Sequence, residues 1–426
     1  MMSLESSQVT FGVEIEFNLA YLEIGNTTPH RASEETPRLL FPPVEEDMKG
    51  YSQQYISENS KSFQGRAGMW NILELLRTAG HPTDKAIRAE GGPRVWKVTD
   101  DSSIRPREGS GYEWQSVEVK SPALEFSSAS LQLVSGVCQL ITKTYVVDVP
   151  PSAGLHVHVS AGAGPFNFQT MKALFIFLWT FEYQLLSLHP PERQQNEYCR
   201  NFRQASRLSR GFYFLHKRPP TIGEGIDLLL SCDDITSLLD LARAAGDSKC
   251  MAYNPVNVLE FENRTCLLPT IEFRQHEGTV DGERITNWIS TIVGLVSRLE
   301  QITPGELLEL VLSQVEREYW QAAHDSTVKS SSLHKLKSIP AQSTFTAIDL
   351  LEWMGLEDQA VYYRGRIFQV VSTQPISPAN ETTGGRDECH IGGENLVESM
   401  KKRIDDEKQG LREKWDSAFD HTKKIG

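Results

Sequence analysis

Four segments of the chain alternate apolar residues with residues that could bind a metal ion or a phosphate group. In a β-strand successive side chains point to opposite faces of the sheet, so each alternation predicts a strand with one buried and one polar face. The predicted strands are Phe11–Phe17, Tyr112–Lys120, Leu155–Ser160 and Thr270–His276. Their polar positions carry carboxylates, imidazoles and cations: Glu14, Glu16, Glu118, Lys120, His156, His158, Glu272, Arg274 and His276.

Each strand alone leaves more than one interpretation open. Glu118 by itself is typical of a solvated sheet face. His156 and His158 fit a metal clasp and a pair of hydrogen-bonded sheet histidines equally well. Glu14 and Glu16 stand in a strand otherwise suited to burial, although glutamate is a poor strand former. Such a local conflict tends to mark a functional site.

Taken together, the four strands indicate a chemistry. Crowded carboxylates repel one another unless cations lie between them. A set of oxygen ligands with few histidines suits Mg²⁺ or Mn²⁺ better than zinc. An arginine beside them suits phosphate oxygens, so the set favours phosphoryl transfer from a nucleotide. The sequence has no GxxxxGK[ST] loop, GxSxG or HExxH motif, and no GxGxxG linked to a predicted strand.

Helices with amphipathic or buried patterns separate these strands. We expect them at Met69–Ala79, Ser130–Val147, Asn167–Leu188, Asp234–Ala245, Arg284–Leu299, Pro304–Trp320 and Ala347–Met354. Arg94–Thr99 and Tyr112–Lys120 are expected to form a hairpin. The Pro- and Glu-rich stretch Glu23–Lys61 predicts a long loop. Leu396–Ala418 predicts a charged, peripheral helix with little apolar face.

Composition narrows the function classes. The 426 residues carry a formal net charge of −13, which argues against a nucleic-acid partner, since phosphate backbones bind basic surfaces. The longest apolar run, Ala173–Trp179, is too short to cross a membrane. The first residues do not resemble a signal peptide, so we expect a cytoplasmic protein without a membrane partner. The 6 cysteines form no CxxC pair and are expected to be reduced structural thiols.

The motifs in their order resemble a known family. FGVEIEF, WKVTDDSSI, VEVKSPAL, GLHVHVS and TIEFRQHEGTVD are together similar to the amidoligases, a branch of the carboxylate–amine ligases that includes glutamine synthetase and glutamate–cysteine ligase. The resemblance covers roughly the first 300 residues. It implies an α+β fold like the catalytic domain of glutamine synthetase, in which a curved antiparallel sheet binds metal on its concave face and packs helices on its convex face.

The resemblance also implies roles for individual residues. Metal ligation is expected for two ions, one at Glu14, His156 and Glu272 and a second at Glu16 and Glu118. His158 is expected beside the nucleotide phosphates, and Arg274 is the expected catalytic contact to the transferred phosphate. The family often reads ELVSP where this chain reads EVKSP. This departure places Lys120, an additional cation, near the site. Asp101, Lys120 and His276 are expected to face the substrate.

The implied domains are a catalytic domain over residues 1–300 with an insertion at about 23–65, a helical extension over 301–372, and a flexible segment with a charged helix over 373–426. The implied activity is ATP-dependent amide formation from a small-molecule or peptide carboxylate and an amine, through an acyl phosphate, with Mg²⁺ or Mn²⁺. Two alternatives stay open. One is a kinase of the same fold that acts on a guanidino or carboxylate acceptor. The other is a ligand-binding relic without catalysis.

Overall fold

The chain folds into two compact units, each assembled from separate stretches of sequence. The computed structural model describes residues 9–21, 50, 52, 54, 60–84, 94–106, 113–162, 164–246, 249–262, 268–329, 344–370 and 393–419. The first unit comprises residues 1–165, 189–199 and 252–297, and the second comprises 166–188, 200–251 and 298–426. The predicted loop over Glu23–Lys61 and the turn-rich stretch after residue 373 lie almost entirely outside the described residues.

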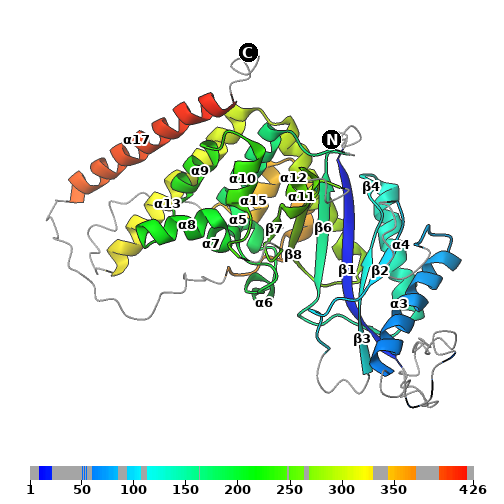
Figure 1. Ribbon diagram of the computed structural model, residues 1–426. Coiled ribbons are helices and arrows are strands. Elements are labelled where there is room, and N and C mark those ends of the chain that lie inside the picture. Colours follow the sequence, from blue (N-terminus) through cyan, green and yellow to red (C-terminus); the bar gives the residue numbers. More distant parts are fainter. Residues whose placement is uncertain are drawn as a thin grey trace. The chain divides into compact units, whose positions relative to one another are not determined.

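An antiparallel sheet with eight strands among the described residues forms the framework of the first unit (Figure 1). Its main path runs β2-β3-β1-β6-β8-β7, and β4 and β5 pair with β1 as well. The strands are β1 (Thr10–Tyr21), β2 (Lys97–Thr99), β3 (Glu113–Lys120), β4 (Leu124–Glu125), β5 (Val147–Asp148), β6 (Gly154–Ser160), β7 (Tyr253–Asn254) and β8 (Ile271–Glu277). The four predicted strands are confirmed as β1, β3, β6 and β8, and the predicted hairpin as β2–β3.

The register of the central strands sets polar residues beside one another. Glu14 on β1 lies opposite Lys120 on β3 and opposite His156 on β6. Glu16 lies opposite Glu118 on β3. Because directly opposed residues of an antiparallel pair share a face, these side chains emerge on one side of the sheet.

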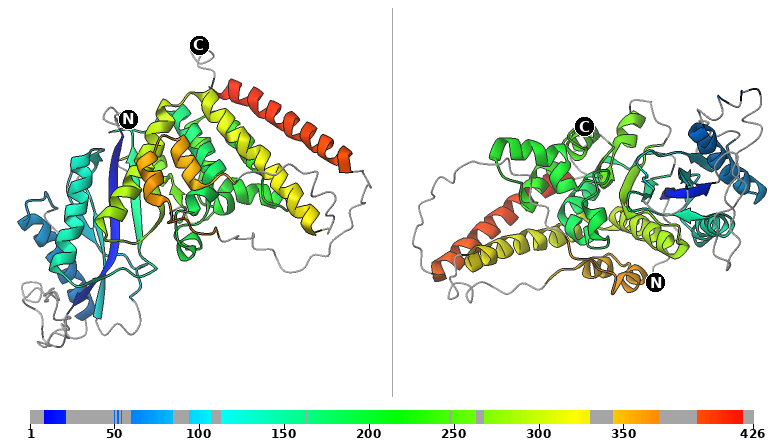
Figure 2. Two further views of the ribbon diagram at one scale, coloured as in Figure 1. Left: turned by 180° about the vertical axis from the view of Figure 1, so that it is seen from behind. Right: turned by 90° about the horizontal axis from the view of Figure 1, so that it is seen from below.

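The first unit contains α3 (Ser60–Thr78), α4 (Ser128–Thr144), α6 (Pro191–Gln194), α11 (Val256–Glu262) and most of α12 (Gly282–Gln301). Of these, α4 and α12 cover the other side of the sheet. Seen from behind, α4 and α12 lie across the sheet (Figure 2). The alternate β1 residues Phe11, Val13, Ile15 and Phe17 are buried on this side, as are most of the apolar positions of both helices. The apolar half of each strand pattern therefore forms the core that holds the polar half in place.

A bulge in β8 overturns one expectation. Phe273 pairs with Val157 and His276 with Leu155, so three steps along β8 match two along β6. One extra residue in a strand reverses the face of every residue beyond it. His276 therefore points to the helix side, where its ring lies 5.5 Å from that of Trp288 on α12. The prediction that His276 shares the face of Glu272 and Arg274 was wrong, because strict alternation was assumed through this bulge.

The described part of the second unit is helical. Its helices are α5 (Phe168–Leu186), α7 (Phe202–Ala205), α8 (Arg207–His216), α9 (Ile222–Leu230), α10 (Ile235–Ala242), α13 (Pro304–Lys329), α15 (Ala347–Trp353), α16 (Glu357–Tyr363) and α17 (Gly393–Phe419). Trp179 of α5 is fully buried and donates its indole N–H to the Ile222 carbonyl at 3.1 Å. A Cβ on Gly225 would overlap the Trp179 ring, so this glycine permits the close approach of α9 to α5. No helix among the described residues is long and apolar enough to cross a membrane.

The C-terminal helix α17 has a larger apolar face than its composition indicated. Ile404, Leu411 and Trp415 are buried, at spacings of seven and four residues that lie along one side of a helix. Ile404 packs with Trp320 of α13 in a small apolar cluster. The prediction of a helix with little apolar face was wrong, because a few large residues at helical spacing form a stripe despite the many charges between them.

Candidate active site

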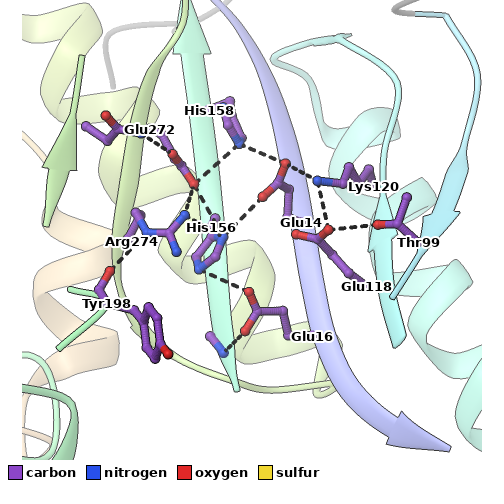
Figure 3. A network of polar contacts seen from close by, with 12 residues as sticks. Glu14, Glu16, Thr99, Glu118, Lys120, His156, His158, Tyr198, Glu272 and Arg274 are labelled. Atoms are coloured by element: carbon purple, nitrogen blue, oxygen red, sulfur yellow. Dashed lines mark hydrogen bonds and ion pairs between the residues drawn. The ribbon is translucent and has the colours of Figure 1, made fainter. Parts of the chain in front are cut away.

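The polar face of the sheet gathers four glutamates around one histidine (Figure 3). Glu14 and Glu16 come from β1, Glu118 from β3 and Glu272 from β8. We call these four residues the carboxylate cluster. All four are buried or nearly so, the most accessible being Glu14 with a side chain 16% exposed. The cluster is thus a dense negative charge removed from water, which is costly unless cations compensate it.

His156 stands at the centre of the carboxylate cluster. Its Nδ1 lies 3.1 Å from Glu14 Oε2 and 3.4 Å from Glu272 Oε1. Its Nε2 lies 3.4 Å from Glu16 Oε1. The second oxygen of Glu16 accepts the backbone N–H of Gly154 at 2.6 Å. The two ring nitrogens therefore face two different groups of carboxylates.

Lys120 joins two members of the cluster. Its ammonium lies 2.9 Å from Glu14 Oε1 and 2.8 Å from Glu118 Oε2, and Thr99 also donates to Glu118 at 2.8 Å. Burial would raise the pKa of Glu14, but Lys120 and the nearby histidines hold that pKa well below its ordinary value. Burial and the Glu14 charge instead raise the pKa of Glu118 well above its ordinary value. Burial opposes the charge on Lys120, yet the two carboxylates raise its pKa, so the ammonium stays protonated.

Arg274 compensates the cluster from the opposite side. Its Nη1 donates to Glu272 Oε1, and its Nε donates to the Tyr198 carbonyl at 3.1 Å. The other oxygen of Glu272 accepts the Asn254 amide at 2.7 Å. Burial acts to raise the pKa of Glu272, but the guanidinium lowers it. Glu272 is therefore ionised and fixed at both oxygens, as a rigid ligand needs to be.

His158 lies one pleat along β6 from His156. Its Nδ1 is 3.1 Å from Thr270 Oγ1, and its Nε2 is 3.3 Å from Glu14 Oε1. Burial would lower the pKa of His158, but the charge of Glu14 raises it. A cationic imidazole at the border of the cluster could contact an anion bound beside it.

The donor atoms fit a divalent cation. Ligand atoms of Glu14, His156 and Glu272 lie within 4.8 Å of one another, and so do those of Glu16, Glu118 and His156. Carboxylate oxygens with a minority of imidazole are the ligands that suit Mg²⁺ and Mn²⁺. The crowding of four carboxylates supports the same assignment, because a divalent ion would relieve their repulsion.

Of two further residues expected at the substrate, the structure contradicts the placement of His276 alone. Asp101 is in the turn after β2, where its carboxylate accepts the Ser103 N–H at 2.7 Å. His276 is on the helix side of the sheet, between the rings of His189 and Trp288. Burial and two nearby arginines lower the pKa of His276 to about 3, so its imidazole is neutral.

Several supporting groups were not anticipated from the sequence. Thr99 could have been found, because the predicted hairpin places it opposite Glu118 once the register is known. Asn254 and the carbonyl of Tyr198 gave no signal, since neither belongs to a periodic pattern and both depend on the tertiary fold. Gly154 acts through its backbone N–H, which no residue type reveals.

Comparison with known proteins identifies the family. A family model described as "Putative amidoligase enzyme" matches residues 7–296. The chain belongs to this amidoligase family. The matched range contains the whole carboxylate cluster together with Lys120, both histidines and Arg274. No curated protein and no solved structure gives a match.

Proposed function

We propose that this amidoligase is an ATP-dependent carboxylate–amine ligase that works through an acyl phosphate. The observation that carries the proposal is the convergence of four carboxylates, two histidines and two cations on one face of a sheet. Membership of the amidoligase family supports a ligase. A carboxylate and an ammonium do not condense at neutral pH, so one partner has to be activated and the charges shielded.

The reaction has two balanced steps. A substrate carboxylate oxygen attacks the γ-phosphorus of ATP, forming an acyl phosphate and releasing ADP. A neutral amine then attacks the acyl carbon, and phosphate leaves with the former carboxylate oxygen. The amine loses one proton to complete the amide. The chemistry needs positioning and charge stabilisation more than covalent help from the protein.

Residues of the site divide these tasks. Glu14, His156 and Glu272 would hold a Mg²⁺ or Mn²⁺ ion, and from sequence a second ion was expected at Glu16 and Glu118. Such an ion, when bound, shields the phosphate oxygens and stabilises the developing charge. The Arg274 guanidinium points into the same space and can contact the transferring phosphoryl group with two N–H donors.

His158 is assigned to nucleotide binding. It borders the cluster at Glu14 and Glu272, and within the described part of the chain no triad with metal-ligand spacing includes it. A charged imidazole there would donate to a phosphate oxygen without entering the metal shell.

A trapping assay tests the reaction without knowledge of the substrate. Protein, ATP, Mg²⁺ and pools of carboxylic metabolites are incubated with hydroxylamine, which attacks acyl phosphates to give hydroxamates. A ligase gives a hydroxamate and one ADP per hydroxamate, and each hydroxamate identifies a carboxylate substrate by mass spectrometry. Paired incubations with metabolite amines then give products lighter by one water than the two substrates together.

Matched controls separate the alternatives. Glu272→Gln in the same assay should lower hydroxamate formation on the order of 10³-fold. A kinase of the guanidino type releases ADP with one acceptor and leaves no hydroxamate. A carboxylate kinase gives a hydroxamate but no dehydrated product with any paired amine. A relic binds nucleotide and releases no ADP, and any of these results would overturn the ligase assignment.

A further inference from the structure

Lys120 occupies an unusual place for a lysine on a sheet. Its Cα lies directly opposite that of Glu14 across β1 and β3, yet its side chain is only 32% exposed. Lysine commonly extends its ammonium into water. Here the ammonium contacts Glu14 and Glu118 at 2.9 and 2.8 Å instead. A monovalent cation supplied by the chain thus joins two carboxylates of the cluster.

The imidazole of His156 can serve only one metal ion. A neutral imidazole has one nitrogen lone pair for a ligand bond, because its other nitrogen carries a proton. The two triads with metal-ligand spacing both use His156, through opposite nitrogens: Nδ1 faces Glu14 and Glu272, and Nε2 faces Glu16. Only one triad can therefore be complete.

The triad of Glu14, His156 and Glu272 is the better one. Coordination through Nδ1 leaves Nε2–H directed at Glu16 Oε1, and such a bond to a carboxylate fixes the ring of a metal-bound histidine. Without the histidine, the other group retains only two carboxylates.

Each of those carboxylates has one oxygen held by the protein. Glu16 accepts the Gly154 N–H through one oxygen. Glu118 accepts Thr99 and Lys120 at one oxygen. Without an imidazole, this second group is deficient in ligands.

The position of the Lys120 ammonium supports the same conclusion. It contacts Glu14 Oε1 and Glu118 Oε2, so a cation of the chain already lies between these two carboxylates. Removal of the Lys120 charge would leave the two carboxylates without this shared cation, which favours a second ion between them.

We propose that the Lys120 ammonium takes the place of a second metal ion, so that the nucleotide-free protein binds one divalent cation, at Glu14, His156 and Glu272. The inference rests on the metal site of the proposed function and departs from its expectation of two ions. It also gives Lys120 a role in the cluster in place of the substrate contact expected from sequence.

Counting bound Mn²⁺ tests the proposal. Equilibrium dialysis of nucleotide-free protein should give one Mn²⁺ per chain for the wild type and two for Lys120→Met. The electron paramagnetic resonance spectrum should change from that of an isolated ion to one broadened by a second ion a few ångströms away. Lys120→Arg, which retains the charge, should bind one ion.

Lys97 supplies the matched control. It lies opposite Lys120 on β2, and the described residues include no carboxylate within ion-pair distance of it. Lys97→Met removes an equal charge from the same face and should still bind one Mn²⁺. Melting temperatures verify that each variant is folded, and Lys120→Gln replaces Lys120→Met should the latter not fold.

The outcomes separate the inference from the proposed function. Two ions in the wild type, or a single ion in the folded neutral variants, would overturn the role of Lys120 and leave the ligase intact. A wild type that binds no Mn²⁺ and forms no hydroxamate would overturn the proposed metal site itself, and the inference with it.

Discussion

Both units of the molecule bury charged side chains, but they compensate them by different means. In the second unit, Glu182 accepts the backbone N–H groups of Phe202 and Arg203 at the start of α7. Lys172 in the same unit donates to the carbonyls of Leu230 and Cys232, at 3.2 and 2.7 Å. Each of these charges joins one helix to a neighbouring segment through the main chain.

The carboxylate cluster of the first unit depends mainly on side chains. Glu14 and Glu118 share Lys120, and Glu272 binds Arg274. Backbone groups cannot leave, so Glu182 and Lys172 keep their partners permanently. Side-chain cations can move aside for a ligand. The difference indicates that burial of charge is structural in the second unit and poised for binding in the first.

The largest effect is expected from Glu272→Gln. The change removes one negative charge from the cluster but retains an oxygen that can accept the Asn254 amide. Turnover of ATP should fall on the order of 10³-fold, because a bound metal ion contributes several kcal/mol to transition-state stabilisation. Steady-state ADP release and the melting temperature measure the two consequences. A folded variant that keeps a tenth of wild-type turnover would remove Glu272 from the metal site.

Arg274→Lys should have the next largest effect. The guanidinium spans Glu272 and the Tyr198 carbonyl, which a single ammonium cannot do. We expect turnover to fall about 10²-fold, as for the loss of one preorganised donor. Affinity for ADP should change little, since the contact strengthens during transfer. If Arg274→Lys were as active as the wild type, Arg274 would serve only to balance charge.

Glu182 should make the stability of the second unit depend on pH. Burial raises the pKa of Glu182 to about 7, above its ordinary value near 4.5. The folded unit then holds a proton that the unfolded chain releases, so stability is highest below about pH 4.5 and falls as pH rises towards 7. The loss is about 3 kcal/mol. Glu182→Gln should flatten this profile, measured as denaturant midpoints between pH 4.5 and 8. If stability of the variant depends on pH as in the wild type, other groups cause the dependence.

The smallest effect is expected from Lys172→Met. The change removes a buried charge, which stabilises the fold. It also leaves the Leu230 and Cys232 carbonyls without this donor, which destabilises the fold, so the two effects partly cancel. Stability should change by about 1–2 kcal/mol. The number of bound Mn²⁺ ions and ATP turnover should stay at wild-type levels, in contrast to Lys120→Met. A change in metal stoichiometry here would contradict the division between structural and binding charges.

Prediction from sequence succeeded where a simple period governs the structure. Alternation with period two located β1, β3, β6 and β8, and therefore most of the cluster. It failed at His276, because the sequence of β8 does not reveal the bulge that reverses the strand. Contacts made by main-chain groups, such as the Gly154 N–H, depend on the tertiary fold and could not be inferred from residue types.

Short helices of the second unit were missed for a different reason. α9 begins with a capping box in which Thr221 and Glu224 satisfy each other's backbone N–H groups. This signature is visible in the sequence, but the helix that follows spans only Ile222–Leu230 and has too few turns for a clear periodicity.

The central position of β1 has a consequence for biosynthesis. Glu14 and His156 are 142 residues apart, and His156 and Arg274 are 118 apart, yet all three meet on neighbouring strands. Contacts of such long range form late, since the intervening chain must first be ordered. On the ribosome, β1 is made long before β6 and β8, so its apolar face is exposed during much of translation. The alternating glutamates of β1 keep the unpaired strand charged. This charge opposes association with other nascent chains until β6 and β8 have been synthesised.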